Sequence, residues 1–465
     1  MSAIASTSSP SPSIDLTTRT CDRITCENKI STLFLGAQQL LIPLREQLDR
    51  SQLSGKWIVE LDPMYNEAEV IFGRDFRVIR HDGSHLLPSM LCEKNLDFKF
   101  LAYLPINCRQ IAQYFHRAGY GKGFSEEYID KKEKVAKDLG LSHEVGRSVL
   151  EGGNCLIFKN AEGQQRSIVG LSSVSLTLIN LEDSGYFLEN SERIAILQST
   201  IDMPSEDFLR MAKNKNLLEE FLPLYDEMLE NRSKNPTKFM ELQTVIRQRF
   251  GGITGVKMEM MAPISSSDIP TYKDKAKELQ AKWSISQEVI AEDLQLPLDS
   301  IGFIPQLDFH IDLSIFVAPG GKVFIHDEEQ VLSLLPERSK NKQIESYRKQ
   351  SESQYLINRK WKLSCADEIV KLGGEPIFVP GKLEGFANSS IHPINLMNAV
   401  LLDDESRSLV ITAQSGVETI DQIFSQLVTG NIPSCELLFL DERLMSTLLR
   451  ETSAGLHCIT WENKS

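Results

Sequence analysis

The sequence predicts an α/β fold in which short strands alternate with amphipathic helices. Apolar or alternating runs of strand length recur along the chain, and Gly, Pro, Asn or Asp often flank them. These predicted strands are residues 57–61, 70–72, 98–104, 155–158, 167–179, 309–318, 322–325, 376–379, 396–402, 408–412 and 436–440. Apolar residues at helical spacing predict helices over residues 37–49, 126–139 and 417–427. Such alternation is typical of α/β proteins rather than of all-α or all-β ones.

Two longer helical patterns interrupt this alternation. Residues 204–294 are rich in charge, and one helical face carries Phe208, Met211, Leu217, Leu218, Phe221 and Leu222. Residues 336–371 form a second, more polar pattern. We interpret both as helical insertions into a single domain that spans residues 31–465, with their charged faces in solvent. We expect the first insertion to control access to a site rather than to place its residues; a docking surface for a partner is the alternative.

The composition narrows the class of protein. Of the 465 residues, 41% are hydrophobic and 25% are charged, as in ordinary globular proteins. The net charge of −14 argues against a nucleic-acid binder, and the lack of a run of 18 apolar residues argues against a membrane span. Eight scattered cysteines without metal-ligand spacing predict free thiols, no metal site and a cytoplasmic location. Residues 1–30, Ser/Thr/Pro-rich at their start, are predicted to be a disordered tail, with an export signal as the alternative.

Four short motifs carry side chains that suit chemistry on a guanidinium group. They are Arg74-Asp75, Glu151-Gly152-Gly153, His310-Ile311-Asp312 and the late cysteine Cys458. A guanidinium cation pairs with carboxylates, and cleavage of its C–N bond needs a nucleophile such as a thiolate and a proton donor such as histidine. On a strand, His310 and Asp312 would point to the same face. Each motif alone has a plainer explanation: a surface ion pair, a turn carboxylate, a core histidine or a buried cysteine.

Taken together in this order, the motifs resemble those of the guanidino-modifying enzymes of the pentein superfamily. The segment Gly455-Leu456-His457-Cys458-Ile459-Thr460 is similar to the end of agmatine deiminases, and Glu151-Gly152-Gly153 is similar to a motif of arginine deiminases. The run from His310 to Val317 is similar to a strand of peptidylarginine deiminases. The motifs span residues 74–460, so the resemblance covers most of the chain.

The resemblance implies a fold, a reaction and a set of roles. The implied fold is a pentein fold, a five-bladed α/β propeller of ββαβ-type units with the site at its centre. Cys458 would be the nucleophile and His310 the general acid/base, while Glu151 would orient His310 and share in substrate binding. Asp75 and Asp312 would bind the guanidinium, and His457 would give support. The enzyme would be an amidinohydrolase, or deiminase, that turns agmatine, arginine or a related compound into a ureido product and ammonia, through a covalent thiouronium intermediate and without a cofactor.

Two departures and three alternatives accompany this interpretation. Agmatine deiminases carry Trp-x-Arg-Asp-Thr-Gly-Pro where this chain has Phe72-Gly73-Arg74-Asp75-Phe76-Arg77. The long separation of Glu151 from His310 is explained by the insertion at 204–294. The alternatives are a deiminase that acts on arginine side chains of a protein, an amidinotransferase of the same fold, and a pentein-fold binding protein without catalysis.

Overall fold

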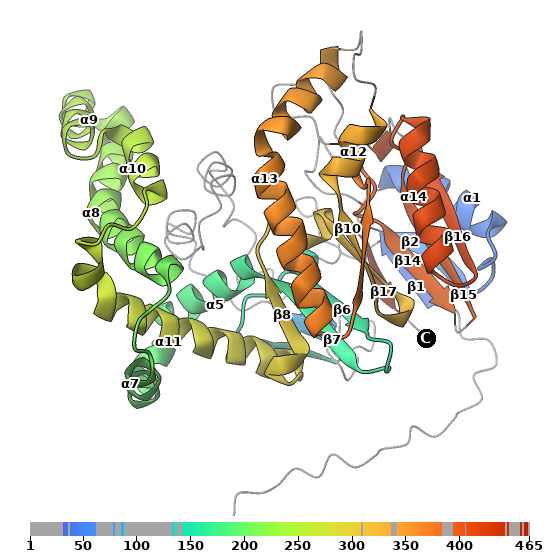
Figure 1. Ribbon diagram of the computed structural model, residues 1–465, viewed down its shortest axis with the longest axis horizontal. Helices are drawn as coiled ribbons and strands as arrows, with labels where there is room; N and C mark the ends of the chain where they lie inside the picture. Colours follow the sequence, from blue (N-terminus) through green and yellow to red (C-terminus); the bar gives the residue numbers. More distant parts are fainter. Residues whose placement is uncertain are drawn as a thin grey trace, which may run out of the picture.

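Figure 1 shows the computed structural model of the chain. It describes residues 31–35, 38–61, 78–79, 85–87, 133–134, 137, 142–307, 310–335, 342–383, 394–404, 406–441, 444–445, 456–457 and 460–463. The predicted strands at 70–72 and 98–104, most of the predicted helix at 126–139 and the N-terminal tail lie outside these residues.

One strand arrangement recurs throughout the described ranges. Five sheets there have three strands, and in each the central strand has an antiparallel neighbour on one side and a parallel neighbour on the other. The sheets are β3 (Val78–Ile79), β4 (His85–Leu87) and β5 (His143–Val145); β6 (Cys155–Lys159), β7 (Gln165–Gly170) and β8 (Ile301–Ile304); β9 (Ile315–Ala318), β10 (Lys322–His326) and β11 (Glu375–Val379); β14 (Val400–Asp404), β15 (Arg407–Ala413) and β16 (Cys435–Leu440); and β17 (Thr460–Asn463), β1 (Ser31–Leu35) and β2 (Trp57–Leu61). A short pair, β12 (Lys382–Leu383) with β13 (Ile394–Asn395), lies between the third and fourth sheets in the sequence.

Helices make the crossovers that parallel strands require. Helix α1 (Gln38–Arg50) connects β1 to β2, α14 (Glu418–Asn431) connects β15 to β16, and α12 (Glu328–Leu334) and α13 (Lys342–Lys371) connect β10 to β11. The fifth sheet joins the two ends of the described chain, because Thr460 in β17 pairs with Leu35 in β1. The α/β class predicted from the sequence is confirmed.

The crossover from β7 to β8 is a helical layer, and its buried residues form one hydrophobic cluster with Cys155, Val169 and Ile301 of the adjoining sheet. Its helices are α5 (Leu171–Asp183), α6 (Tyr186–Glu189), α7 (Ser191–Thr200), α8 (Glu206–Lys234), α9 (Pro236–Phe250), α10 (Gly252–Met261) and α11 (Asp268–Leu294). In Figure 1, α8, α9 and α10 lie to one side of the sheets. Met211, Leu218 and Phe221 are buried in this layer, and Phe208 packs edge-to-face against Trp283 of α11.

Three predicted strands differ from the observed elements. The run at 167–179 is strand only to Gly170 and then becomes α5, whose residues from Ser172 to Leu181 are all buried. A helix that is buried on every side has no apolar period, so it cannot be told from a strand by pattern. The runs at 309–318 and 396–402 begin with turns, and their strands start only at Ile315 and Val400.

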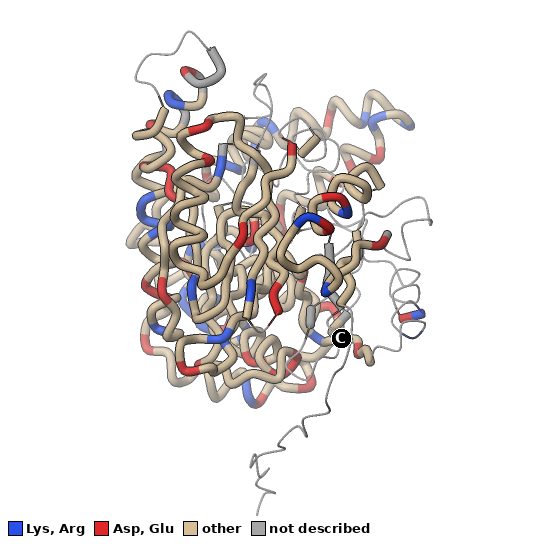
Figure 2. The backbone as a smooth tube through the Cα atoms, turned by 90° about the vertical axis from the view of Figure 1, so that its right-hand side faces the viewer, with Lys and Arg blue, Asp and Glu red and all other residues tan. Residues whose placement is uncertain are grey.

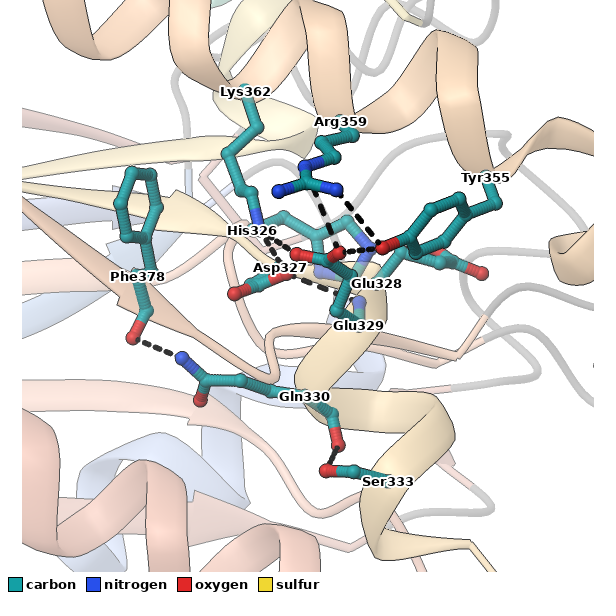
Figure 3. Close-up of polar contacts among 10 residues, drawn as sticks. All are labelled: His326, Asp327, Glu328, Glu329, Gln330, Ser333, Tyr355, Arg359, Lys362 and Phe378. Atoms are coloured by element: carbon teal, nitrogen blue, oxygen red, sulfur yellow. Dashed lines mark hydrogen bonds and ion pairs between the residues drawn. The ribbon is translucent and has the colours of Figure 1, made fainter.

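A buried ionic network fastens α13 to the end of β10 and the start of α12, as Figure 3 shows. The Lys362 ammonium lies 2.6 Å from Oδ1 of Asp327 and 2.7 Å from Oε2 of Glu329. His326 Nε2 lies 2.9 Å from Oε2 of Glu328, and the Tyr355 hydroxyl donates to Glu329. The backbone N–H of His326 donates to the Ser314 carbonyl over 2.9 Å, so the network also supports the turn that precedes β9.

Candidate active site

The candidate residues lie just before corresponding strands of three sheets. Glu151 precedes η3 (Gly152–Asn154), a 3-10 turn that leads into β6; Asp312 is part of η5 (Ile311–Leu313), the 3-10 turn before β9; and His457 precedes β17. β6 contacts β9, and the two 3-10 turns contact each other. The repeated strand arrangement therefore brings residues that are far apart in the sequence to neighbouring strand ends. Asp75 and Cys458 lie outside the described residues.

Glu151 and His310 form a buried pair. Nε2 of His310 lies 2.7 Å from Oε2 of Glu151, and the two side chains are almost completely withdrawn from solvent. When Glu151 is ionised, the Nε2–H of His310 donates to it. The ring packs against Gly153, where an added Cβ would lie 2.5 Å from Nδ1 of His310. The second glycine of the Glu-Gly-Gly motif is therefore needed for the imidazole to occupy this position.

Asp312 pairs with a different histidine. Nδ1 of His457 lies 2.7 Å from Oδ2 of Asp312, and both side chains are buried. The side chain of Asn398 joins the two segments, because its Oδ1 accepts from the His457 backbone N–H over 2.7 Å and its Nδ2 donates to the Asp312 carbonyl over 3.4 Å. The residue immediately before Cys458 is thus tied to the His-x-Asp turn. His457 had been expected to give support only, and nothing in the sequence singled out Asn398.

The prediction that His310 and Asp312 share one face of a strand is wrong. His310 has extended backbone (φ −126°, ψ 147°), but Ile311 begins a 3-10 turn that the Ser314 N–H closes on the Ile311 carbonyl over 2.9 Å. Ladder pairing begins only where Ile315 faces Ile325. The turn sends the two side chains to separate partners, Glu151 and His457.

A cavity of about 440 Å³ reaches one of the two pairs. Asp312 and His457 line it, together with residues of three first strands: Leu156 and Phe158 of β6, Ile315 and Val317 of β9, and Leu401 and Asp403 of β14. Glu151 and His310 are not among the described residues that line this cavity. This cavity therefore reaches the Asp312–His457 pair and not the Glu151–His310 pair, and the η5 turn connects the two pairs.

The helical insertion contacts the segment that leads to Glu151. Asp293, near the end of α11, is buried, and its Oδ2 accepts the Ser148 backbone N–H over 2.6 Å. Ser148 lies three residues before Glu151. At Gly146, an added Cβ would lie 2.7 Å from the same Asp293 oxygen. α11 is thus packed closely against the chain that leads to the site.

The thiols in the described part of the chain are poorly suited to act as nucleophiles. Burial raises the pKa of Cys155 to about 11, against a small opposing effect of its hydrogen bond with Ser167. Burial, and then the charge of Glu368, raise the pKa of Cys365 well above its usual value, and burial raises the pKa of Cys435 to about 11. A thiol must lose its proton to attack, so these three are largely inert at neutral pH.

The described ranges also bear on metal binding and on insertion into a membrane. They contain no group of three or more His, Cys, Asp or Glu side chains arranged to hold a metal ion. No helix within them has the length and apolar character needed to cross a membrane. In the view of Figure 2, Lys and Arg positions are interspersed with Asp and Glu positions along the backbone.

Comparison with known proteins finds similarity among solved structures alone. No protein-family model and no curated protein matches the sequence. The chain is similar to C. jejuni agmatine deiminase, with a TM-score of 0.41 and 12% identity over 94% of each chain. A substrate-bound form of that enzyme, with a serine in place of one cysteine, gives a TM-score of 0.38 and 11% identity over 94% of each chain. At this level of similarity, the comparison assigns neither a family nor an activity to this chain.

Proposed function

We propose that this chain is a cysteine-dependent amidinohydrolase that converts a guanidino group into a ureido group and ammonia. The observation that carries the proposal is the meeting of two carboxylate–imidazole pairs at one turn. Glu151 and His310 are 159 residues apart in the sequence, and Asp312 and His457 are 145 apart. Buried carboxylates beside histidines suit both the binding of a cation and the movement of protons.

In the proposed reaction, the Cys458 thiolate adds to the central guanidinium carbon, and a C–S bond forms as the C=N electron pair moves to nitrogen. The His310 imidazolium gives its proton to one terminal nitrogen, and the C–N bond breaks to release ammonia. This leaves a thiouronium group on Cys458. His310 then takes a proton from water as the water oxygen attacks the same carbon. The C=O bond forms as the C–S bond breaks and the thiolate returns; the remaining hydroxyl proton passes to solvent, where the released ammonia takes it up, and the ureido product leaves.

The carboxylates have separate roles in this proposal. Asp312 would bind the guanidinium, because it is the carboxylate of the two pairs that lines the cavity. Asp75 would be its second carboxylate partner. Glu151 would hold His310 through Nε2 and stabilise its protonated form, since an adjacent negative charge favours an imidazolium.

The five similar sheets support a pentein fold for the chain. We propose that each sheet with its crossover is one ββαβ-type blade, and that the pairing of β17 with β1 closes the ring. Residues 31–465 would then form one catalytic domain, with the insertion at 204–294, which comprises α8–α11, in the crossover of the second blade and with α13 extending that of the third. The contact of β6 with β9 is consistent with first strands around a common axis.

The proposal is tested by turnover. The full chain is incubated separately with agmatine, free arginine and arginine-containing peptides, and ammonia and the ureido product are both quantified. Equal amounts of the two products, absent with Cys458→Ala, support the deiminase. Transfer of the group to an added amine without ammonia indicates an amidinotransferase, and activity confined to the peptides indicates a protein-arginine deiminase. Binding without either product in every arm overturns catalysis and leaves a binding protein.

A further inference from the structure

A second set of buried polar side chains lies directly behind the Glu151–His310 pair. Asn154, Ser172 and Gln306 are each only 1% exposed, and they come from the turn before β6, the first turn of α5 and the segment after β8. Asn154 directly follows Gly153 of the Glu-Gly-Gly motif, whereas Ser172 and Gln306 belong to no motif that the sequence singled out. Polar groups at this depth are retained when their hydrogen bonds are satisfied.

The amide of Asn154 lies at the centre of this set. Its Nδ2 donates to Glu151 Oε2 over 3.3 Å and to Ser172 Oγ over 3.2 Å. Its Oδ1 accepts from Gln306 Nε2 over 2.8 Å and from the Ile311 backbone N–H over 3.2 Å. A side-chain amide has two N–H donors and two acceptor lone pairs, so all of its hydrogen-bonding capacity is used. One side chain thus connects the Glu151 carboxylate to the peptide that follows His310.

Backbone groups determine which way this amide faces. The Ile311 N–H can only donate, so the atom that meets it must be Oδ1 of Asn154, and Nδ2 must then face Glu151. The Ser172 backbone N–H donates to Gln306 Oε1 over 2.7 Å, which in turn directs Gln306 Nε2 toward Asn154 Oδ1. The arrangement therefore presents an N–H donor, and never an acceptor, to Glu151.

Close packing holds the amides in this arrangement. At Gly170, an added Cβ would lie 2.7 Å from Oε1 of Gln306 and 2.9 Å from Oδ1 of Asn154. On the other side, the His310 ring fills the space beside Gly153. The His310 ring is therefore packed against Gly153, and the amides of Asn154 and Gln306 are packed against Gly170.

We propose that Asn154 is a positioning residue for the acid/base pair. It donates to Oε2 of Glu151, the same oxygen that His310 Nε2 contacts, and through Ile311 it fixes the backbone next to His310. The Asn154 amide thereby fixes the position of the Glu151 carboxylate relative to the His310 imidazole. This inference rests on the proposed deiminase function for its kinetic consequence, but the geometry it describes exists without substrate.

Asn154→Asp is the sharpest test, because it keeps the shape and replaces the donor with an acceptor. At neutral pH, the new carboxylate would face Glu151 and repel it. At lower pH, protonation would give the new side chain an O–H that can donate to Glu151. A hydrogen bond to a charged group is typically worth about 10- to 100-fold in an equilibrium or a rate. We expect kcat to fall by about that factor at pH 8 with KM changed less than about threefold, and the deficit to shrink as the pH is lowered.

Asn160→Asp is the matched control. Asn160 flanks the other end of the same strand, is also buried, and uses its side chain fully within the turn at 160–164 and on the Leu372 carbonyl. This variant should lose stability without altering kcat or the pH profile. Gln306→Glu is a second variant of the network, and it should lower kcat in the same direction by removing the donor to Asn154 Oδ1.

Histidine NMR separates this inference from the proposed function. In protein labelled with 15N-histidine, the His310 ring resonances, assigned with His310→Gln, should shift in Asn154→Asp and Gln306→Glu but not in Asn160→Asp. If the wild type turns over no guanidine, the proposed function fails while a selective shift still supports the positioning role. If His310 resonances are the same in the wild type and both network variants, or if Asn160→Asp moves them equally, the positioning role is overturned.

Discussion

Nδ1 of His457 lies 2.7 Å from Oδ2 of Asp312, and both side chains are buried beside a cavity of about 440 Å³. The contact joins the residue before Cys458 to the second residue of the Ile311–Leu313 turn. Because the imidazole contacts the carboxylate, the cation binding that we propose for Asp312 would be coupled to the position of the C-terminal segment. The Asn398 side chain reinforces this coupling through its contacts with both segments.

Asp312→Asn should weaken the binding of a guanidino ligand by orders of magnitude. The amide retains an acceptor for His457 but removes the negative charge, and loss of one partner of a desolvated charge pair costs about 2–5 kcal/mol. Calorimetric titration of the folded variant measures the change. Asp403→Asn is the control, because Asp403 lines the same cavity from β14. Equal affinity of Asp312→Asn and wild type would show that the cation is bound elsewhere.

Cys458 should be labelled by a haloacetamidine in preference to the other cysteines, and Cys458→Ala should abolish turnover without unfolding the chain. The thiols of Cys155 and Cys435 have their pKa raised to about 11, so at pH 8 about one in a thousand would be ionised. Their labelling should therefore increase steeply as the pH rises toward 11. Peptide mass spectrometry after a short exposure at pH 8 measures the selectivity. Comparable labelling of Cys435 and Cys458 would argue against an activated thiolate.

Asp293→Ala should lower both stability and turnover, although Asp293 belongs to the helical insertion. Its removal leaves the buried Ser148 N–H without this acceptor, at a cost of about 1–3 kcal/mol, and loosens the segment that leads to Glu151. Glu292→Ala is the neighbouring control. Glu292 is half exposed and pairs with Arg147, so its loss should cost no more than about 1 kcal/mol. Urea unfolding and steady-state kinetics distinguish them; indistinguishable kinetics would mean that α11 does not help to place Glu151.

Lys362→Met should be strongly destabilising. Burial acts to lower the pKa of Lys362, but hydrogen bonds to Asp327 and Glu329 outweigh it and raise the pKa, so the ammonium stays charged. Removing it leaves the buried Asp327 carboxylate without its ammonium partner in the network of Figure 3, and breaking a buried pair in this way typically costs about 3–5 kcal/mol. Glu329 is partly exposed and keeps Tyr355 and Arg359 as partners. Lys371→Met on the same helix is the control, since Lys371 is exposed and pairs only with Glu368 among the described ion pairs. Similar urea midpoints for the two variants would contradict this ranking.

Glu328 should make the fold sensitive to acid. Burial acts to raise its pKa, but hydrogen bonds with His326, Ser351 and Tyr347, together with the charge of His326, lower the pKa to about 2. A depressed folded pKa contributes stability that is complete above the ordinary carboxyl value near 4.5 and is lost as the pH falls toward about 2. Glu328→Gln should remove about 3 kcal/mol of the difference in unfolding free energy between pH 7 and pH 2, whereas Glu352→Gln, exposed on α13, should not. If the unfolding free energy of Glu328→Gln changes with pH as much as that of the wild type, a residue other than Glu328 causes the acid sensitivity.

The sequence predicted the α/β class and the side chains with distinctive chemistry, because Glu-Gly-Gly and His-x-Asp are short local patterns. It did not predict their partners. Asn154, Gln306 and Asn398 are amides at unremarkable spacings, and their importance depends on which turns meet in three dimensions. The 3-10 turn at Ile311–Leu313 was missed because residues 310–315 alternate polar and apolar side chains, which is the pattern of a strand. Asp293 was assigned to a dispensable layer because its contact with Ser148 joins positions 145 residues apart.

The most direct measurement is the intact mass of the protein, quenched in acid during turnover of a guanidino substrate. The covalent mechanism predicts a transient species heavier than the free chain by the mass of the substrate less one ammonia, because the thiouronium forms as ammonia departs. Peptide mapping should locate the added mass on Cys458, and Cys458→Ala should never acquire it. Ureido product formed at the wild-type rate by Cys458→Ala, or an adduct located on another residue during turnover, would contradict the account.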